Sequence, residues 1–274
     1  MTNRKYFSYF YGMTFGLWSN KQLILGMSKR EVLARYRGSL LGLMWSFVHP
    51  IILLCVYTFV FSVIFKIKWG QIHDTHANFA IVVFIGLIVF NVVSECLNRA
   101  PNLMGDNRNY VKKVVFPLEI LPFTVFLPAL VHFALSFVIL LIALLISGHM
   151  IHLSSFLIPI VLLPLVLITI GFMWILSAIG SYIKDVGQSI PMINILLLFG
   201  SPILYPLSIV PEVFLPIYLL NPLTIAIENL RGLLLFGLFP NPTELAIYII
   251  FSIIIYCSGF FVFTRMRRGF ADVL

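Results

Sequence analysis

Six long apolar runs constrain this 274-residue chain more than any other feature of its sequence. Each run approaches the roughly 20 residues that a helix needs to cross the hydrocarbon core of a bilayer. Barrel strands would instead give weakly alternating segments of about ten residues, so helices are expected. The runs cover residues 40–65, 79–97, 120–146, 157–183, 190–205 and 245–263. The sequence therefore predicts an all-α membrane protein with six transmembrane helices.

The composition agrees with a membrane location. Hydrophobic residues make up 61% of the chain and charged residues only 10%, which leaves too little polar surface to cover a soluble globule of this length. No internal repeat or linker divides the sequence. We therefore expect a single membrane domain over residues 1–274. Its expected parts are a cytoplasmic leader with an interfacial helix at 1–39, a membrane region at 40–263 and a cytoplasmic tail at 264–274.

The basic residues predict the orientation of the chain, because cytoplasmic loops retain Lys and Arg. With a cytoplasmic N-terminus, all but Lys66, Lys68 and Arg231 of the 18 basic residues fall on the inner side. Both termini are then cytoplasmic, which agrees with an even number of spans. The net charge of +8 is spread over separate loops instead of one stripe. We therefore expect contacts with membrane lipids and protein partners, and no nucleic acid.

Two cytoplasmic segments are candidates for contact with a partner protein. Residues 18–37 can form an interfacial helix with basic residues between two narrow apolar lines; a simple basic anchor is the alternative. The loop 98–119 joins a possible helix cap at Asp106 to a basic, aromatic turn that ends at Pro117. This pattern favours a short docking helix, and topology signals alone are the alternative. The candidate contact residues are Lys29, Arg30, Arg35, Asn109, Tyr110, Lys112 and Lys113.

Residues 205–241 are apolar but too interrupted by proline to form a straight span. The stretches 210–220 and 223–238 are short enough to enter the outer leaflet and return, where protein or water covers the backbone ends. An external re-entrant hairpin that closes a pore is one interpretation, and a surface cap lying on the lipid is the other. Glu228 and Arg231 are spaced to pair on one helix face. The candidate gate residues are Pro206, Pro211, Pro222, Glu228 and Arg231.

Aromatic residues are the clue to a substrate, since they make up 15% of the chain. Sugars pack their C–H faces on aromatic rings, while ring hydroxyls and indole N–H groups bond their polar edges. Aromatic side chains that face lipid would give the same composition. The candidate channel aromatics are Tyr57, Phe61, Phe65, Trp174, Tyr182, Phe199 and Tyr205.

Several absent motifs narrow the mechanism. The chain has no G-x-x-x-x-G-K-[ST] phosphate loop, so ATP-driven work would need a second polypeptide. The middles of the expected spans carry no Asp, Glu, Lys or Arg, which disfavours ion-driven transport. His132 is best explained by hydrogen-bonded packing, and the external histidines by loop polarity instead of a metal site. We therefore expect this chain to have no catalytic residue, metal or cofactor of its own.

Five separated motifs resemble those of type-2 ABC exporter permeases for O-antigen, capsule and teichoic-acid chains, and the resemblance covers nearly the whole chain. The chain departs from these permeases at Ile225, where many have a polar or basic residue. The motifs are REVLARYRGSLLGLMWSFVHPIILLCVYTFVFSVIF at 30–65, NYVKKVVFPLEILP at 109–122, YIKDVGQSIPMINILLLFGSPILYP at 182–206, NPLTIAIENLRGLL at 221–234 and RRGFADVL at 267–274.

The resemblance implies a homodimer in the bacterial inner membrane that surrounds a channel. Two copies of a separate ATP-binding subunit would lie beneath it and hold ATP and Mg. The leader helix and the loop at 109–113 would transmit ATP-driven closure, and the hairpin would form an external gate. An undecaprenyl-linked polysaccharide would pass the aromatic side chains. The alternatives are a type-2 permease for teichoic acid, a lipid or a drug, and a non-transport membrane scaffold for polymer synthesis.

Overall fold

The computed structural model describes residues 18–37, 39, 42–60, 76–112, 116–150 and 152–273, and every regular element among them is helical. The all-α prediction is confirmed for this part of the chain. The longer helices are α2 (Lys21–Tyr36), α3 (Trp45–Tyr57), α4 (His76–Arg99), α7 (Leu121–Ile146), α8 (Ile158–Tyr182), α9 (Asp185–Phe199), α11 (Pro222–Arg231) and α12 (Pro242–Met266). The shorter ones are η1 (Gly42–Met44), α5 (Leu103–Asp106), α6 (Arg108–Val111), η3 (Leu118–Ile120), η4 (Leu153–Leu157), η5 (Leu207–Ile209), α10 (Leu215–Leu220), η6 (Gly232–Phe236), η7 (Arg267–Gly269) and α13 (Phe270–Val273).

Four helical stretches are long and apolar enough to cross a membrane: Phe79–Arg99, Leu118–Ile146, Leu153–Tyr182 and Pro242–Gly269. The first stretch lies within α4, and the other three contain α7, α8 and α12. Two further apolar helices, Trp45–Val60 and α9, are shorter. With a rise of about 1.5 Å per residue, the 15 residues of α9 cover about 22 Å, less than the roughly 30 Å of a hydrocarbon core. Four of the six apolar runs expected to span the membrane thus form helices long enough to cross it, whereas the other two form shorter helices.

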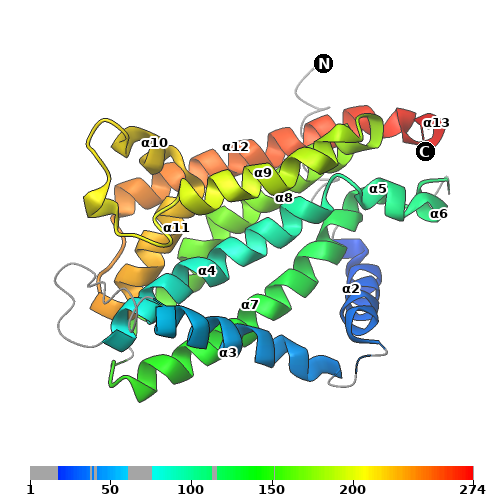
Figure 1. Ribbon diagram of the computed structural model, residues 1–274. Helices are drawn as coiled ribbons and strands as arrows, with labels where there is room; N and C mark the ends of the chain where they lie inside the picture. Colours follow the sequence, from blue (N-terminus) through cyan, green and yellow to red (C-terminus); the bar gives the residue numbers. More distant parts are fainter. Residues whose placement is uncertain are drawn as a thin grey trace.

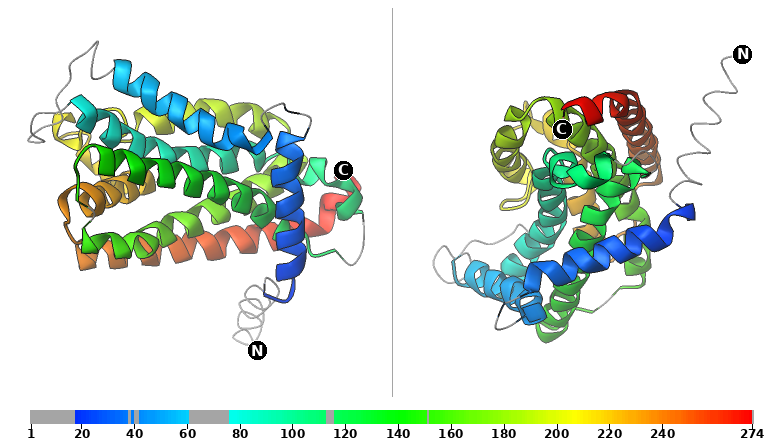
Figure 2. Two further views of the ribbon diagram at one scale, coloured as in Figure 1. Left: turned by 90° about the horizontal axis from the view of Figure 1, so that it is seen from below. Right: turned by 90° about the vertical axis from the view of Figure 1, so that its right-hand side faces the viewer.

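The long helices run side by side, and the short elements gather at the two ends of the bundle (Figures 1 and 2). Helix α2 lies across one end, roughly perpendicular to the bundle, and α5, α6 and α13 lie at the same end. Helices α10 and α11 lie at the opposite end. The first and last described helices are therefore at one end of the molecule, as an even number of crossings requires.

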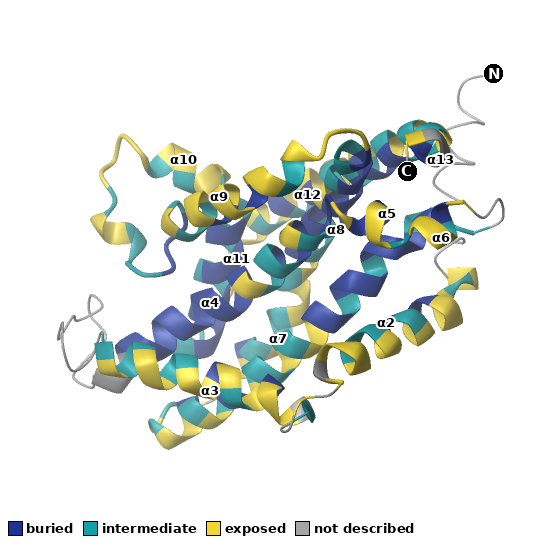
Figure 3. Ribbon diagram, turned by 45° about the vertical axis from the view of Figure 1, so that its right-hand side comes forward, coloured by how far each residue is buried: buried dark blue, intermediate teal, exposed yellow. Residues whose placement is uncertain are grey.

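Helix α4 is the centre of the bundle, and its surroundings explain its composition. In its most apolar window 78% of the residues are buried within the protein, compared with 22% in α7 and in α12 (Figure 3). Residues from α4, α7, α8 and α11 form one continuous core around it, and a second core joins α7, α8 and α12. The outer faces of α7 and α12 remain apolar and exposed, as expected for helices in contact with lipid.

Glycines set the close packing of α8 on α12. A Cβ atom at Gly171 would lie 2.7 Å from the Ile255 carbonyl oxygen, and one at Gly259 would overlap the Gly171 carbonyl oxygen. Small residues allow helix backbones in membranes to approach closely, where dispersion contacts replace the missing hydrophobic drive. These two glycines therefore bring α8 and α12 together.

Candidate functional site

The junction between α2 and α4 is the first candidate region. Glu31 and Arg35 lie one turn apart on α2, and Glu95 and Arg99 lie one turn apart on α4. Arg35 Nη2 is 2.5 Å from Glu95 Oε1, and Arg99 Nη2 is 2.5 Å from Glu31 Oε1. Each helix thus contributes one acid and one base. All four side chains are partly exposed, so each pair contributes only modestly to stability.

A groove of about 530 Å³ includes Glu31 and Arg99 of this junction in its wall, and it is lined mainly by α2, α5 and α6 with two residues of α7. Its wall includes Arg30, Asn109 and Tyr110. The Tyr110 ring stacks on Phe116 with 4.6 Å between the ring centroids. The structure therefore places Arg30 of α2 on the same surface as Asn109 and Tyr110 of the loop 98–119. All three are residues for which the sequence predicts contact with a partner protein.

The remaining contact candidates lie near this groove or outside the described residues. Lys29 is exposed on α2, and Lys112 is exposed directly after the end of α6. Lys113 is outside the described residues. The expected cap at Asp106 is wrong, because Asp106 is the last residue of α5. Asn107 precedes α6 instead, and its side-chain amide donates to the Leu103 carbonyl oxygen at 2.9 Å. The expected single docking helix is a pair of one-turn helices.

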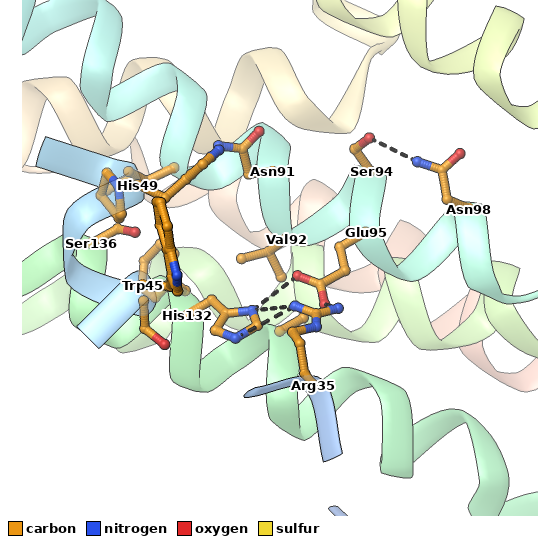
Figure 4. A pocket seen from close by; sticks show the side chains of 15 residues that line it. Arg35, Trp45, His49, Asn91, Val92, Ser94, Glu95, Asn98, His132 and Ser136 are labelled. Atoms are coloured by element: carbon orange, nitrogen blue, oxygen red, sulfur yellow. Dashed lines mark hydrogen bonds and ion pairs between the residues drawn. The ribbon is translucent and has the colours of Figure 1, made fainter. Parts of the chain in front are cut away.

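A polar cleft of about 480 Å³ opens where α2, α3, α4 and α7 meet (Figure 4). Arg35 and Glu95 meet His132 of α7 at its edge: His132 Nδ1 is 3.2 Å from Glu95 Oε2 and 2.9 Å from Arg35 Nη1. His49 of α3 and Asn91 of α4 also line the cleft. One of the two ion pairs that hold α2 is therefore part of the cleft wall.

The hairpin at the opposite end has one exposed and one buried arm. None of the residues of α10 is buried, whereas α11 packs into the core around α4. The Asn221 side chain caps α11 by accepting from the Leu223 backbone N–H at 3.0 Å. It also donates to the Gly200 carbonyl oxygen at 3.0 Å, which fixes α11 to the end of α9. Of the two arms expected to enter the protein or the lipid, only the second is covered by protein.

Arg231 connects this hairpin to the bundle, with only 2% of its surface exposed. Its guanidinium donates to the carbonyl oxygens of Val82 at 3.0 Å, Pro202 at 2.6 Å and Ile203 at 3.0 Å. It also donates to Glu228 Oε1 at 2.8 Å, which confirms the expected pair. Burial lowers the pKa of Arg231 to about 10, although the Glu228 carboxylate opposes this shift, so the side chain remains charged at neutral pH.

The gate candidates thus have different surroundings. Arg231 and the start of α11 at Pro222 are anchored in the protein. Pro206 directly precedes η5, and Pro211 lies in the exposed connection that leads to α10. Glu228 is about 39% exposed. The rigid part of the hairpin is therefore α11, while α10 and its connection cover the outside.

Trp174 packs in the interior of the subunit. It is fully buried, and its indole N–H donates to the Glu119 carbonyl oxygen at 3.1 Å. Its ring lies 4.9 Å from that of Tyr256 and 5.2 Å from that of Phe260, measured between centroids. Its contacts are those of a core residue that joins α8 to α12 and η3.

The other channel candidates are closer to the surface. Phe199 is 58% exposed at the end of α9, and Tyr205 follows it with a hydroxyl 2.6 Å from that of Tyr218 on α10. Tyr182 donates to the Met266 carbonyl oxygen at 3.0 Å near the opposite end. Tyr57 is half-buried against the core around α4. Phe61 and Phe65 lie outside the described residues.

The sequence interpretation passed over Glu95 and Asn91, although a pattern marks them. Asn91, Ser94, Glu95 and Asn98 recur at the helical spacing i, i+3, i+4 and i+7 within an apolar span. Such a stripe indicates a polar surface along one side of the helix. His132 is hydrogen-bonded, as expected, but its partners belong to the cleft. Among the described residues no three His, Cys, Asp or Glu side chains are placed to share a metal ion.

Comparisons with known proteins identify the family of the chain. The chain is 26% identical over 258 residues to an O-antigen export system permease protein RfbA of Myxococcus xanthus, covering 93% of this chain and 96% of the relative. It is 25% identical to an RfbA of Klebsiella pneumoniae, with 92% and 95% covered, and 23% identical to the polysialic acid transport protein KpsM of Escherichia coli, with 84% and 88% covered. The family model for ABC-2 type transporters matches residues 22–235. Because this match covers more than half of the chain, the chain belongs to the ABC-2 type transporter family.

Proposed function

We propose that this chain forms the membrane channel of an ATP-driven exporter for a lipid-linked polysaccharide of the O-antigen kind. The observation that carries the proposal is similarity, over nearly the full length of each chain, to relatives named for O-antigen export and polysialic acid transport. The chain supplies the channel and does no covalent chemistry. Two copies would form a homodimer in the bacterial inner membrane, with both termini cytoplasmic and α3 and α9 completing six crossings.

The groove between α2, α5 and α6 is the proposed contact with the ATP-binding subunit, one for each copy of the chain. It exposes basic and aromatic side chains at one end of the bundle, and the ion pairs to Glu95 and Arg99 connect α2 to the central helix α4. A shift of α2 would therefore act on the most buried span. ATP and Mg would be bound by the partner subunit, since this chain has no phosphate loop.

The hairpin of α10 and α11 is the proposed external gate. Arg231 holds α11 against α4 and the turn after α9, so the gate is attached to the same central helix as α2. Helix α4 is thus the proposed mechanical link between the two ends. The undecaprenyl-linked polymer would pass exposed aromatic side chains such as Phe199.

The test is to purify the tagged chain from its native membrane in mild detergent and identify what accompanies it. We expect a stoichiometric ATP-binding protein and vanadate-sensitive ATP hydrolysis, together with loss of surface polysaccharide when the gene is deleted. A chain that purifies alone and leaves surface polysaccharide unchanged would contradict the proposal and favour a membrane scaffold. ATP hydrolysis stimulated by a drug, a lipid or teichoic acid instead would favour a permease for that substrate.

A further inference from the structure

The cleft between α2, α3, α4 and α7 concentrates polar groups inside an otherwise apolar bundle. Asn91 belongs to the full-length span α4, and its exposed side chain has no hydrogen-bond partner among the described residues. His49 of α3 and Ser136 of α7 line the same cleft and likewise have no such partner there. Polar groups in a bilayer are costly unless they are satisfied, so this cleft must hold water or a polar ligand.

The charges in the cleft favour a neutral ligand over an anion. Arg35 is already paired with Glu95 at 2.5 Å, and His132 contacts both side chains. His49 is the other titratable group that lines the cleft among the described residues. A phosphate site normally offers several cations or backbone N–H groups with donors to spare. Here one cation faces one carboxylate, and most of the remaining polar groups are amides and hydroxyls.

The shape and the apolar walls agree with a sugar ring. The volume of about 480 Å³ falls within the roughly 300–1,000 Å³ of small-molecule sites. Trp45 of α3 and Phe133 of α7 line it, and they offer ring faces for the C–H side of a pyranose. Amides, hydroxyls and a carboxylate supply both donors and acceptors for sugar hydroxyls.

We infer that this cleft binds one pyranose unit of the exported glycan, with Asn91 and Glu95 bonding its hydroxyls and Trp45 covering one face. The inference deepens the proposed export function and rests on it. Because Glu95 also holds Arg35 of α2, a bound sugar contacts the same carboxylate that joins α2 to α4. Binding of a sugar in the cleft would therefore affect the ion pair that holds α2 in position.

The test uses the full chain in lipid nanodiscs, without sugar-headed detergents that would occupy the site. Saturation-transfer NMR is recorded with methyl glycosides of mannose, galactose, glucose and rhamnose, and with inorganic phosphate as competitor. Asn91→Leu removes an amide from the cleft, and Ser136→Phe fills its volume. Gln188→Leu is the matched control, because it replaces an exposed amide on α9, away from the cleft.

We expect transfer to at least one glycoside in the native chain and in the control, with no competition by phosphate. Each cleft variant should weaken binding about five- to tenfold, and Asn91→Gln should recover part of it. Size-exclusion profiles identify a variant that fails to fold, in which case the other variant provides the result. No transfer to any glycoside, unchanged binding in the folded cleft variants, or competition by phosphate would each overturn the inference.

The two proposals fail in different ways. A complex that exports polysaccharide while the purified chain binds no glycoside would remove the sugar site and leave the exporter. A chain that binds glycosides at the cleft but has no ATP-binding partner would remove the exporter and leave the sugar site.

Discussion

Arg99 of α4 donates to Glu31 of α2 at 2.5 Å, one turn along both helices from the pair that Arg35 forms with Glu95. The acid precedes the base on each helix, so the two helices match only in one register and one direction. Such a reciprocal pair fixes orientation more than it adds stability, because exposed ion pairs are individually weak. It gives the protein a defined contact between an end helix and its central span.

Exchanging the charges of Glu31 and Arg99 tests this contact. Each single reversal, Glu31→Arg or Arg99→Glu, places like charges together and should lower the free energy of unfolding. The exchanged double variant should recover most of the loss. We expect a coupling energy of about 0.5–1 kcal/mol, because both side chains are partly exposed. Denaturant titrations of the four purified proteins measure it, and strictly additive effects would contradict a direct pair.

Arg231 should be far more sensitive to substitution than its partner Glu228. Arg231→Met leaves the carbonyl oxygens of Pro202 and Ile203 without this donor, at roughly 1–3 kcal/mol for each buried group, whereas Val82 lies within α4 and keeps its helical backbone bond. Glu228→Gln affects only a half-exposed acceptor and should change stability by less than about 1 kcal/mol. The two variants are compared by denaturant titration. Equal losses would mean that Arg231 acts mainly through the ion pair.

Two glycine substitutions with opposite expected effects test the packing of α8 on α12. Gly259→Ala places a methyl group against the Gly171 carbonyl and should lower stability by about 1–3 kcal/mol. Gly26→Ala is the matched control, since nothing lies within 4 Å of its Cβ position on α2. There the gain in helix propensity should raise stability by about 0.5–1 kcal/mol. A neutral Gly259→Ala would show that the two helices can separate without cost.

The sequence predicts the helices well because long apolar runs have one solution in a bilayer. The same argument does not predict which helices pack against each other, because the sequence of an apolar helix face is similar whether lipid or protein covers it. Helix α4 is therefore not distinguishable in advance as the central span. Arg231 illustrates a second limit: counted as an external charge, it lies in the interior and bonds to carbonyls remote in sequence. Only the i, i+3 pair with Glu228 was local enough to predict.

The basic residues after α6 should affect coupling to the ATP-binding subunit. Reversing Lys112 and Lys113 to Glu should reduce ATP hydrolysis of the complex several-fold, because the new negative charges would repel acidic side chains of the proposed partner subunit. Lys112 is exposed directly after α6, which lines the groove through Tyr110. Lys184→Glu is the control, because it reverses an exposed cation at the start of α9, outside that groove. Hydrolysis by the purified complexes is measured at equal subunit ratio. Unchanged hydrolysis in the double variant would argue against a docking role.

Trp174 and Phe199 separate a core aromatic residue from a channel aromatic residue. Trp174→Ala removes a fully buried ring and should cost about 3–5 kcal/mol of stability, with any loss of export following from misfolding. Phe199 is 58% exposed, so Phe199→Ala should leave the unfolding midpoint nearly unchanged. If its ring lines the channel, that variant should still reduce surface polysaccharide at normal protein level. Phe199→Tyr keeps the aromatic face and should restore export, whereas full export by Phe199→Ala would remove this residue from the channel wall.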